Sequence, residues 1–196
     1  MKTDKAISPT WKFIIAILLC ESIGIISGLL ASANNNVWFD NLNKPTWNPP
    51  AYLFGPVWTT LYLLMGISLS LVWKNKATEL NKRNAYLLFA TQLFLNFWWS
   101  IFFFHFHSPE WALVDIVLMV ITIILTIFSF SSFSKTASWL LVPYISWVSF
   151  ATILNFSIWY FNHWPGGIQN QLSLKKYTHL NNAASNFLSE CFFATE

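Results

Sequence analysis

The chain contains five long stretches that carry almost no formal charge. They cover residues 13–33, 51–73, 85–106, 111–134 and 136–162 of the 196-residue sequence. The charged side chains within them are Glu21 in the first stretch and Asp115 in the fourth. A bilayer core of about 30 Å is crossed by roughly 20 apolar residues in a helix, so each stretch is long enough to span it. Only 10% of the residues are charged, against about 25% in soluble domains.

These stretches predict an all-α membrane protein, a bundle of five transmembrane helices over about 11–33, 51–73, 84–106, 111–133 and 137–162. The first stretch exceeds the apolar core of a signal peptide, which favours a retained first helix. Short polar connections favour one membrane domain over residues 1–164. From residue 165 to residue 196 the composition turns to Asn, Ser and Gln, which predicts a poorly ordered polar tail of no assigned role.

Basic residues fall mostly on one side of the predicted bundle. That side holds Lys2, Lys5, Lys12, Lys74, Lys76, Lys82, Arg83 and Lys135, and the other holds Lys44, Lys175 and Lys176. Because basic residues are retained on the cytoplasmic side, the N-terminus is expected in the cytoplasm if the host is a bacterial inner membrane. The net charge of +3 is too small and too scattered to indicate nucleic-acid binding.

Small residues recur at every fourth position of the first predicted helix. They are Ala16, Cys20, Gly24, Gly28 and Ser32. Helices in lipid associate through close backbone approach at such residues. The stripe therefore predicts a packing face, either within the bundle or in a homodimer. Glu21 lies off the stripe, and the sequence suggests no partner for it.

Three other predicted helices each carry a line of polar or aromatic side chains. The lines are Gln92, Asn96 and Ser100; then Asp115, Thr122 and Thr126; then Tyr144, Trp147, Ala151 and Asn155. Polar groups inside a membrane are expected to face a partner or a cavity, because exposing them to lipid is costly. The lines predict either an inward cavity or hydrogen bonds between helices.

Tryptophan is unusually abundant, with 12 residues, and its positions fall into two groups. Indoles normally collect at the headgroup levels of a membrane, yet Trp58, Trp98, Trp99 and Trp147 lie well inside predicted helices. Several deep indoles beside polar lines favour a pocket for a large, flat, apolar ligand over packing alone. No metal site is expected, since His105 and His107 point to nearly opposite sides of a helix. No cofactor is expected to be required. If the flat ligand is a porphyrin, a metal-free ring is expected at least as readily as haem.

The loop between the first two helices combines Pro45, Pro49 and Pro50 with two tryptophans. Proline fixes its own φ and pushes the preceding residue toward extended conformations, which makes such a loop stiff. A stiff aromatic loop predicts either a lid over the bundle or an interfacial anchor. The lid residues would be Trp38, Lys44, Pro45 and Trp47.

Motifs in this loop and in the helices carry a resemblance to a known family. They are Trp38-x-x-x-Leu42-x-Lys44-Pro45-x-Trp47-x-Pro49-Pro50, Gly55-Pro56-Val57-Trp58-x-x-Leu61-Tyr62, Leu95-Asn96-x-x-Trp99, Trp111-Ala112-Leu113-Val114-Asp115 and Pro143-Tyr144-x-x-Trp147. The set resembles the signature of the TspO/MBR family of tryptophan-rich sensory proteins and translocator proteins (peripheral-type benzodiazepine receptors). The resemblance covers about residues 11–164 and keeps the motif order.

The resemblance implies a five-helix bundle, often dimeric, with a pocket that opens toward the loop after the first helix. Members of this family bind porphyrins such as protoporphyrin IX, and sterols in the animal relatives. By motif position the ligand-binding residues would be Trp58, Tyr62, Asn96, Trp99, Trp111, Asp115, Tyr144, Trp147 and Ala151. Specific sterol recognition is less expected, because no Lys or Arg occurs between Lys135 and Lys175.

Three functions remain open from the sequence. The leading prediction is a tetrapyrrole-binding membrane protein acting in transport, sensing or regulation. The second is a light- and oxygen-dependent porphyrin-degrading enzyme, because Trp58 and Trp147 match a pair implicated in such breakdown in bacterial relatives. The sequence contains no triad, metal cluster or phosphate loop that would support ordinary catalysis. The third is a structural membrane partner that uses the small-residue stripe for assembly.

Overall fold

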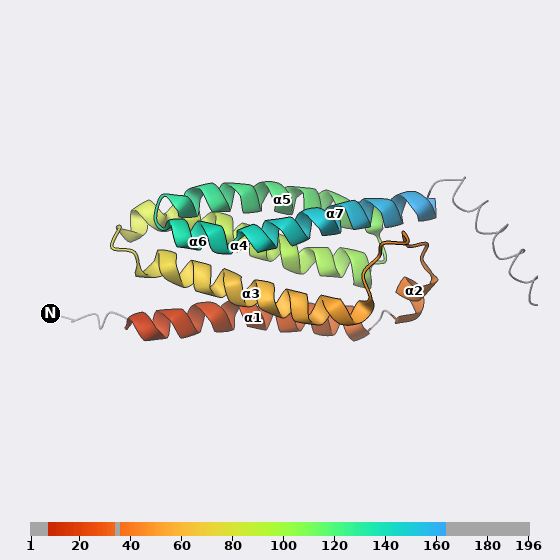
Figure 1. The fold of residues 1–196 in the computed structure, drawn as a ribbon, viewed down its shortest axis with the longest axis horizontal. Coiled ribbons are helices and arrows are strands. Elements are labelled where there is room, and N and C mark those ends of the chain that lie inside the picture. The colour runs from red at the N-terminus through yellow and green to blue at the C-terminus, as the bar shows by residue number, and fades with distance from the viewer. Residues whose placement is uncertain (1–7, 34–35, 164–196) are drawn as a thin grey trace, which may run out of the picture.

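The computed structural model describes residues 8–33 and 36–163 and forms an elongated helical bundle (Figure 1). The main helices are α1 (Pro9–Ala33), α3 (Ala51–Lys74), α4 (Glu79–Ser100), α5 (Pro109–Ser131) and α7 (Val142–His163). Shorter elements are α2 (Asn36–Asn41), the π-helical turn η1 (Ile101–His105) that continues α4, and α6 (Lys135–Leu140), which precedes α7. The described residues form five spans long and apolar enough to cross a membrane. The predicted all-α, five-span architecture is confirmed.

Local sequence explains where two of the helices begin. The sequence predicts a start for α4 near residue 84, but the helix begins at Glu79. Thr78 is the N-cap, and its side chain accepts a hydrogen bond from the amide of Asn81 at 3.4 Å, which satisfies a donor that the helix itself leaves free. Pro109 opens α5, where its missing N–H is no loss.

The segment predicted as one helix over 137–162 is divided into α6 and α7. The break falls at Leu141, two residues before Pro143. Proline has no amide hydrogen and its ring clashes with the carbonyl four residues earlier, so an uninterrupted helix is disfavoured here. The two pieces still count as one membrane span, Lys135–His163.

Helix α1 packs closely on α3 through small residues of both helices. Ala16 and Cys20 are fully buried, and a Cβ atom added at Gly66 of α3 would lie 2.7 Å from the Cα of Ile17. A Cβ at Gly24 would meet the ring of Tyr62 at 2.4 Å. The first three residues of the small-residue stripe therefore serve packing inside the bundle. Of the other two, Gly28 has open space beside it and Ser32 lies in the last turn of α1.

The segment after α1 is more ordered than a plain loop, because residues Asn36–Asn41 form α2. The following turn is tied to the end of α7. The amide of Asn43 donates to Asn162 Oδ1 at 3.0 Å, and Asn162 Nδ2 donates back to the Asn43 carbonyl at 3.1 Å. Figure 1 shows α2 and this connection at the end of the bundle where α3 begins and α7 ends. We call this the loop end, and the end that holds the α3–α4 connection the opposite end. The predicted tail, 165–196, lies outside the described residues.

Candidate functional site: two adjoining cavities at the loop end

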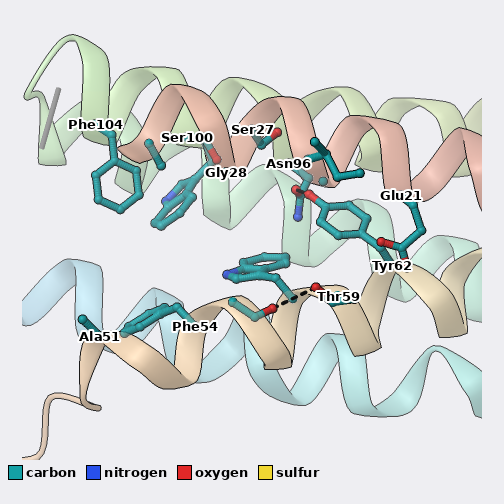
Figure 2. Close-up of a pocket in the computed structure, with 16 residues that line it drawn as sticks. Glu21, Ser27, Gly28, Ala51, Phe54, Thr59, Tyr62, Asn96, Ser100 and Phe104 are labelled. Atoms are coloured by element: carbon teal, nitrogen blue, oxygen red, sulfur yellow. Dashed lines mark hydrogen bonds between the residues drawn. The ribbon is translucent and has the colours of Figure 1, made fainter. Parts of the chain in front are cut away.

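The first cavity has a volume of about 410 Å³ and lies between α1, α3 and α4. Its walls are rich in aromatic rings, namely Phe54, Trp58, Tyr62, Trp99 and Phe104. Figure 2 shows Phe54 and Phe104 toward one end of this space, and Tyr62 with Glu21 at the other. The sequence places aromatic residues here at helical spacing, since Phe54, Trp58 and Tyr62 are four residues apart on one face of α3.

A buried hydrogen-bond network backs the polar end of this cavity. The Tyr62 hydroxyl donates to Asn96 Oδ1, and Asn96 Nδ2 donates to the Tyr144 hydroxyl at 3.1 Å. The Tyr144 hydroxyl in turn contacts Met119 Sδ at 3.5 Å. All four residues are buried, so the network links α3, α4, α5 and α7 in an interior where unpaired polar groups are costly. It fixes the positions of Tyr62 and Asn96 in the cavity wall.

The second cavity, of about 360 Å³, adjoins the first and extends beneath α2. Phe39 and Asp40 of α2 line one side, and Ala151, Leu154, Asn155 and Ile158 of α7 line another. Both cavities share the wall residues Ala31, Ala51, Phe54, Trp99 and Phe104. The two spaces therefore adjoin, with Trp99 in the wall that both share, and we call the pair the branched hollow.

Side chains in these walls keep buried hydrogen-bonding atoms that no described residue uses, Ser27 Oγ among them. Trp99 Nε1 and Asn155 Oδ1 are buried and make no hydrogen bond to any described residue. Asn155 uses its amide nitrogen to donate to the Pro109 carbonyl at 2.9 Å, which holds the side chain in place. The walls, which also contain polar side chains such as Asn96, thus hold a donor and an acceptor that no described residue uses.

The structure brings together five of the nine ligand-binding residues that the resemblance implies. Trp58, Tyr62, Asn96 and Trp99 line the first cavity, and Ala151 lines the second. The other four lie behind or outside the walls of both.

Tyr144 lies behind Asn96 in the network, and the Trp147 ring packs on Phe54 at 5.9 Å between centroids. Asp115 is buried with Oδ2 unpaired by any described residue, but it lines neither cavity. Trp111 is 61% exposed on α5 and also lines neither. An exposed indole at a helix end is typical of an interfacial anchor.

The predicted lid residues lie at the loop end, where they contact α2, η1 and α7. Trp38 stacks on His107 with ring centroids 4.4 Å apart and meets Phe103 edge-on at 5.6 Å. Lys44 Nζ lies 4.0 Å from the centre of the Phe39 ring and 3.5 Å from Asp40 Oδ1.

The remaining two differ in exposure. Pro45 is buried, whereas Trp47 is 46% exposed. The Trp47 ring packs on Phe150, with ring centroids 5.7 Å apart. The lid reaches the second cavity through Phe39 and Asp40, two residues that sequence reasoning missed because it read α2 as loop.

Sequence reasoning also missed Phe54 and Phe104, and it gave Glu21 no position. The helical spacing of Phe54 and Trp58 is a signal that identifies the first. No comparable signal identifies Phe104, which lies on the π-helical turn η1, since a π turn changes the direction of side chains relative to an α-helix. In the described part of the chain, no three His, Cys, Asp or Glu side chains gather where they could hold a metal ion.

Comparison with known proteins identifies relatives of this chain. The TspO/MBR family model matches residues 16–160. The tryptophan-rich protein TspO of Chlorobaculum tepidum is 45% identical over 144 residues, which cover 71% of this chain and 89% of that protein. TspO of Archaeoglobus fulgidus is 42% identical over 151 residues, 77% of this chain and 97% of that protein. The human translocator protein is 37% identical over 163 residues, 82% of this chain and 96% of that protein. With five membrane spans, a family match over most of its length and relatives at these identities, the chain belongs to the TspO/MBR family.

Proposed function

We propose that this membrane protein binds a tetrapyrrole such as protoporphyrin IX in the branched hollow at the loop end, in the service of transport, sensing or regulation. One observation carries the proposal: Trp58 and Trp99 line the same cavity together with Phe54 and Phe104. Faces of aromatic rings stack on flat conjugated ligands, and small-molecule sites typically enclose about 300–1,000 Å³. Names of relatives, such as translocator protein, support a role in moving or sensing a ligand.

The polar groups at the loop end suit the acidic edge of such a ligand. A porphyrin carries carboxylates on one edge of an apolar ring. At this end Lys44 Nζ lies 3.5 Å from Asp40 Oδ1, and Asp40 lines the second cavity. A ligand carboxylate competes with Asp40 for Lys44. The ring then lies deeper, between the indoles.

A titration of the full chain in detergent or nanodiscs tests the proposal. Binding is followed through the Soret absorption of protoporphyrin IX, so that the removal of a tryptophan does not remove the signal. Trp58→Leu is expected to weaken binding at least tenfold. Trp139→Leu is the matched control, because Trp139 lies on α6 and is 72% exposed. Equal affinity of both variants and the parent protein would overturn the proposal.

Photochemical breakdown of the porphyrin is the second candidate function. Trp58 lines the first cavity, and Trp147 is separated from that cavity by the single ring of Phe54. An excited porphyrin in the hollow would therefore have one indole in contact and a second one ring away. Illumination with and without oxygen, using native and heat-denatured protein, separates binding from catalysis. Porphyrin loss at the same rate with denatured protein rules out an enzyme.

The proposed orientation places the loop end on the side of the membrane away from the cytoplasm. At the opposite end Lys74, Lys76, Arg83 and Lys135 are exposed, and this bias follows the positive-inside rule. Labelling of single cysteines introduced at positions 46 and 76 in intact bacterial cells tests the orientation. A membrane-impermeant maleimide is expected to react at position 46 alone.

A further inference from the structure

Glu21 lies in the middle of a membrane-spanning helix. It is twelve positions from Pro9 and twelve positions from Ala33, which is about 18 Å of helix in each direction. An ionisable side chain at such a depth is costly unless it pairs with another group or faces a polar space. Its position therefore calls for a partner.

No described residue supplies that partner. The three ion pairs among the described residues are Lys44–Asp40, Lys82–Glu79 and His163–Glu110. The nearest basic residue on α1 is Lys12, nine positions earlier, or about 13 Å along the helix, and its Nζ is directed to the Trp73 carbonyl at 3.4 Å. The neighbouring Tyr62 hydroxyl donates its hydrogen to Asn96.

The surroundings of Glu21 favour a cation. Glu21 lines the first cavity together with Trp58 and Tyr62, whose ring centroids lie 5.7 Å apart. Figure 2 shows Glu21 beside Tyr62 at the end of the cavity remote from Ala51. Faces of Trp and Tyr attract ammonium groups, and the attraction grows when water is excluded. A carboxylate beside Tyr62, in the same cavity as Trp58, therefore suits an ammonium group.

We propose that the Glu21 end of the first cavity binds the protonated amine of a lipophilic ligand whose apolar body fills the aromatic part. The cavity follows α3 from Ala51 to Tyr62, eleven residues or about 16 Å, which gives room for a ring system and a short spacer. This ligand class differs from the acidic tetrapyrrole, and the inference rests on the proposed function only in using the same cavity.

Two pyrene probes test the inference in the full chain, reconstituted in phosphatidylcholine nanodiscs. 1-Pyrenebutylamine is cationic at neutral pH, and 1-pyrenebutanol has the same ring and spacer without the charge. Energy transfer from tryptophan to pyrene reports binding, with empty nanodiscs as the baseline for partition. The protein is expected to bind the amine at least tenfold more tightly than the alcohol. In Glu21→Gln this preference falls to about one, and Glu21→Asp retains part of it.

Glu110→Gln is the matched control, since it also removes one carboxylate but lies at the start of α5 and lines neither cavity. It is expected to keep the preference for the amine. Equal affinities for the two probes in the parent protein, or an unchanged preference in Glu21→Gln, would overturn the amine site. Such a result leaves the tetrapyrrole proposal standing if the Soret titration still responds to Trp58→Leu. If Trp58→Leu leaves the affinity for protoporphyrin IX unchanged while the preference for the amine persists, the tetrapyrrole proposal alone is overturned.

Discussion

Lys82 at one end of the bundle and Trp99 and Asn155 at the other differ in how their buried polar atoms are paired. At the opposite end Lys82 is almost completely buried, and its Nζ donates to the carbonyls of Trp73 (3.5 Å) and Asn75 (3.2 Å) and to Glu79 Oε1 (2.8 Å). At the loop end Trp99 Nε1 and Asn155 Oδ1 have no partner among the described residues. Buried polar groups normally find partners, so a group left without one marks a place built for something else. The Lys82 hydrogen bonds therefore hold the opposite end together, whereas the unpartnered atoms of Trp99 and Asn155 belong to residues in the cavity walls.

Two glycines show a related contrast, between a packed helix face and a cavity wall. A Cβ at Gly66, midway along the packed α1–α3 face, would meet the backbone of Ile17 at 2.7 Å and the Ala16 carbonyl oxygen at 3.0 Å. A Cβ at Gly28, in the wall of the first cavity, would meet nothing within 4 Å. The same residue type therefore serves close helix contact at one position and open space at the other.

The largest effect on stability is expected from Gly66→Ala. The added methyl group has to push α1 away from α3, because the atoms it meets belong to the backbone, and such overpacking costs about 1–3 kcal/mol. We expect a value near the upper limit, measured as a lower free energy of unfolding in detergent. Gly28→Ala is the control and is expected to leave stability unchanged. Similar losses in both variants would contradict the contrast between packed and hollow regions.

Lys82→Met is expected to be the next most harmful change. It removes the donor to the carbonyls of Trp73 and Asn75 and to the Glu79 carboxylate. The Trp73 carbonyl keeps Lys12 as a donor and Glu79 is exposed, so the main loss is at the Asn75 carbonyl, and a buried acceptor left unpaired costs about 1–3 kcal/mol. Stability should fall by about 2 kcal/mol while affinity for protoporphyrin IX stays the same. Lys76→Met provides the comparison, since Lys76 is exposed. A change in affinity without a change in stability would show that the two ends are coupled rather than separate.

The sequence predicts the spans well, because long uncharged stretches in lipid have one stable backbone conformation, the helix. It fails where local geometry decides. The sequence predicts a loop at residues 36–41, where the structure has α2, and it predicts one helix where the last span is divided near Pro143. The π-helical turn at Ile101–His105 leaves no mark in the hydrophobic pattern, although it directs Phe104 into the hollow.

The site is only partly predictable for a related reason. Helical spacing identifies residues on one face, so Trp58 and Tyr62 are correctly grouped. Spacing does not tell which face of a neighbouring helix meets these residues. The sequence therefore does not predict that Glu21 lines this cavity, or that Trp147 lies behind Phe54. Both depend on how helices rotate against one another, which packing decides.

Trp99 and Trp111 form the sharpest pair for ligand affinity. The resemblance assigns both to the pocket, but Trp99 lies where the two cavities join and Trp111 is 61% exposed. Trp99→Leu is expected to weaken protoporphyrin IX binding about tenfold, or about 1.4 kcal/mol. Trp111→Leu should change it less than twofold. The Soret titration measures both, and a large loss in Trp111→Leu would place that indole in contact with the ligand.

The smallest effect is expected in the lid, where two tryptophans differ in how firmly they are held. The Trp38 ring is stacked on His107 and touches Phe103, which lines the second cavity. Trp47 is half exposed, and its ring packs edge-on against Phe150. If the lid retains the ligand, loosening the better-packed ring should speed release more. Trp38→Ala is expected to raise the dissociation rate about threefold, since affinity differences among related variants arise mostly in dissociation, and Trp47→Ala to leave it nearly unchanged. Stopped-flow displacement of bound protoporphyrin IX measures both rates, and a faster release from Trp47→Ala than from Trp38→Ala would mean that the ligand leaves past α3 and α7 rather than beneath α2.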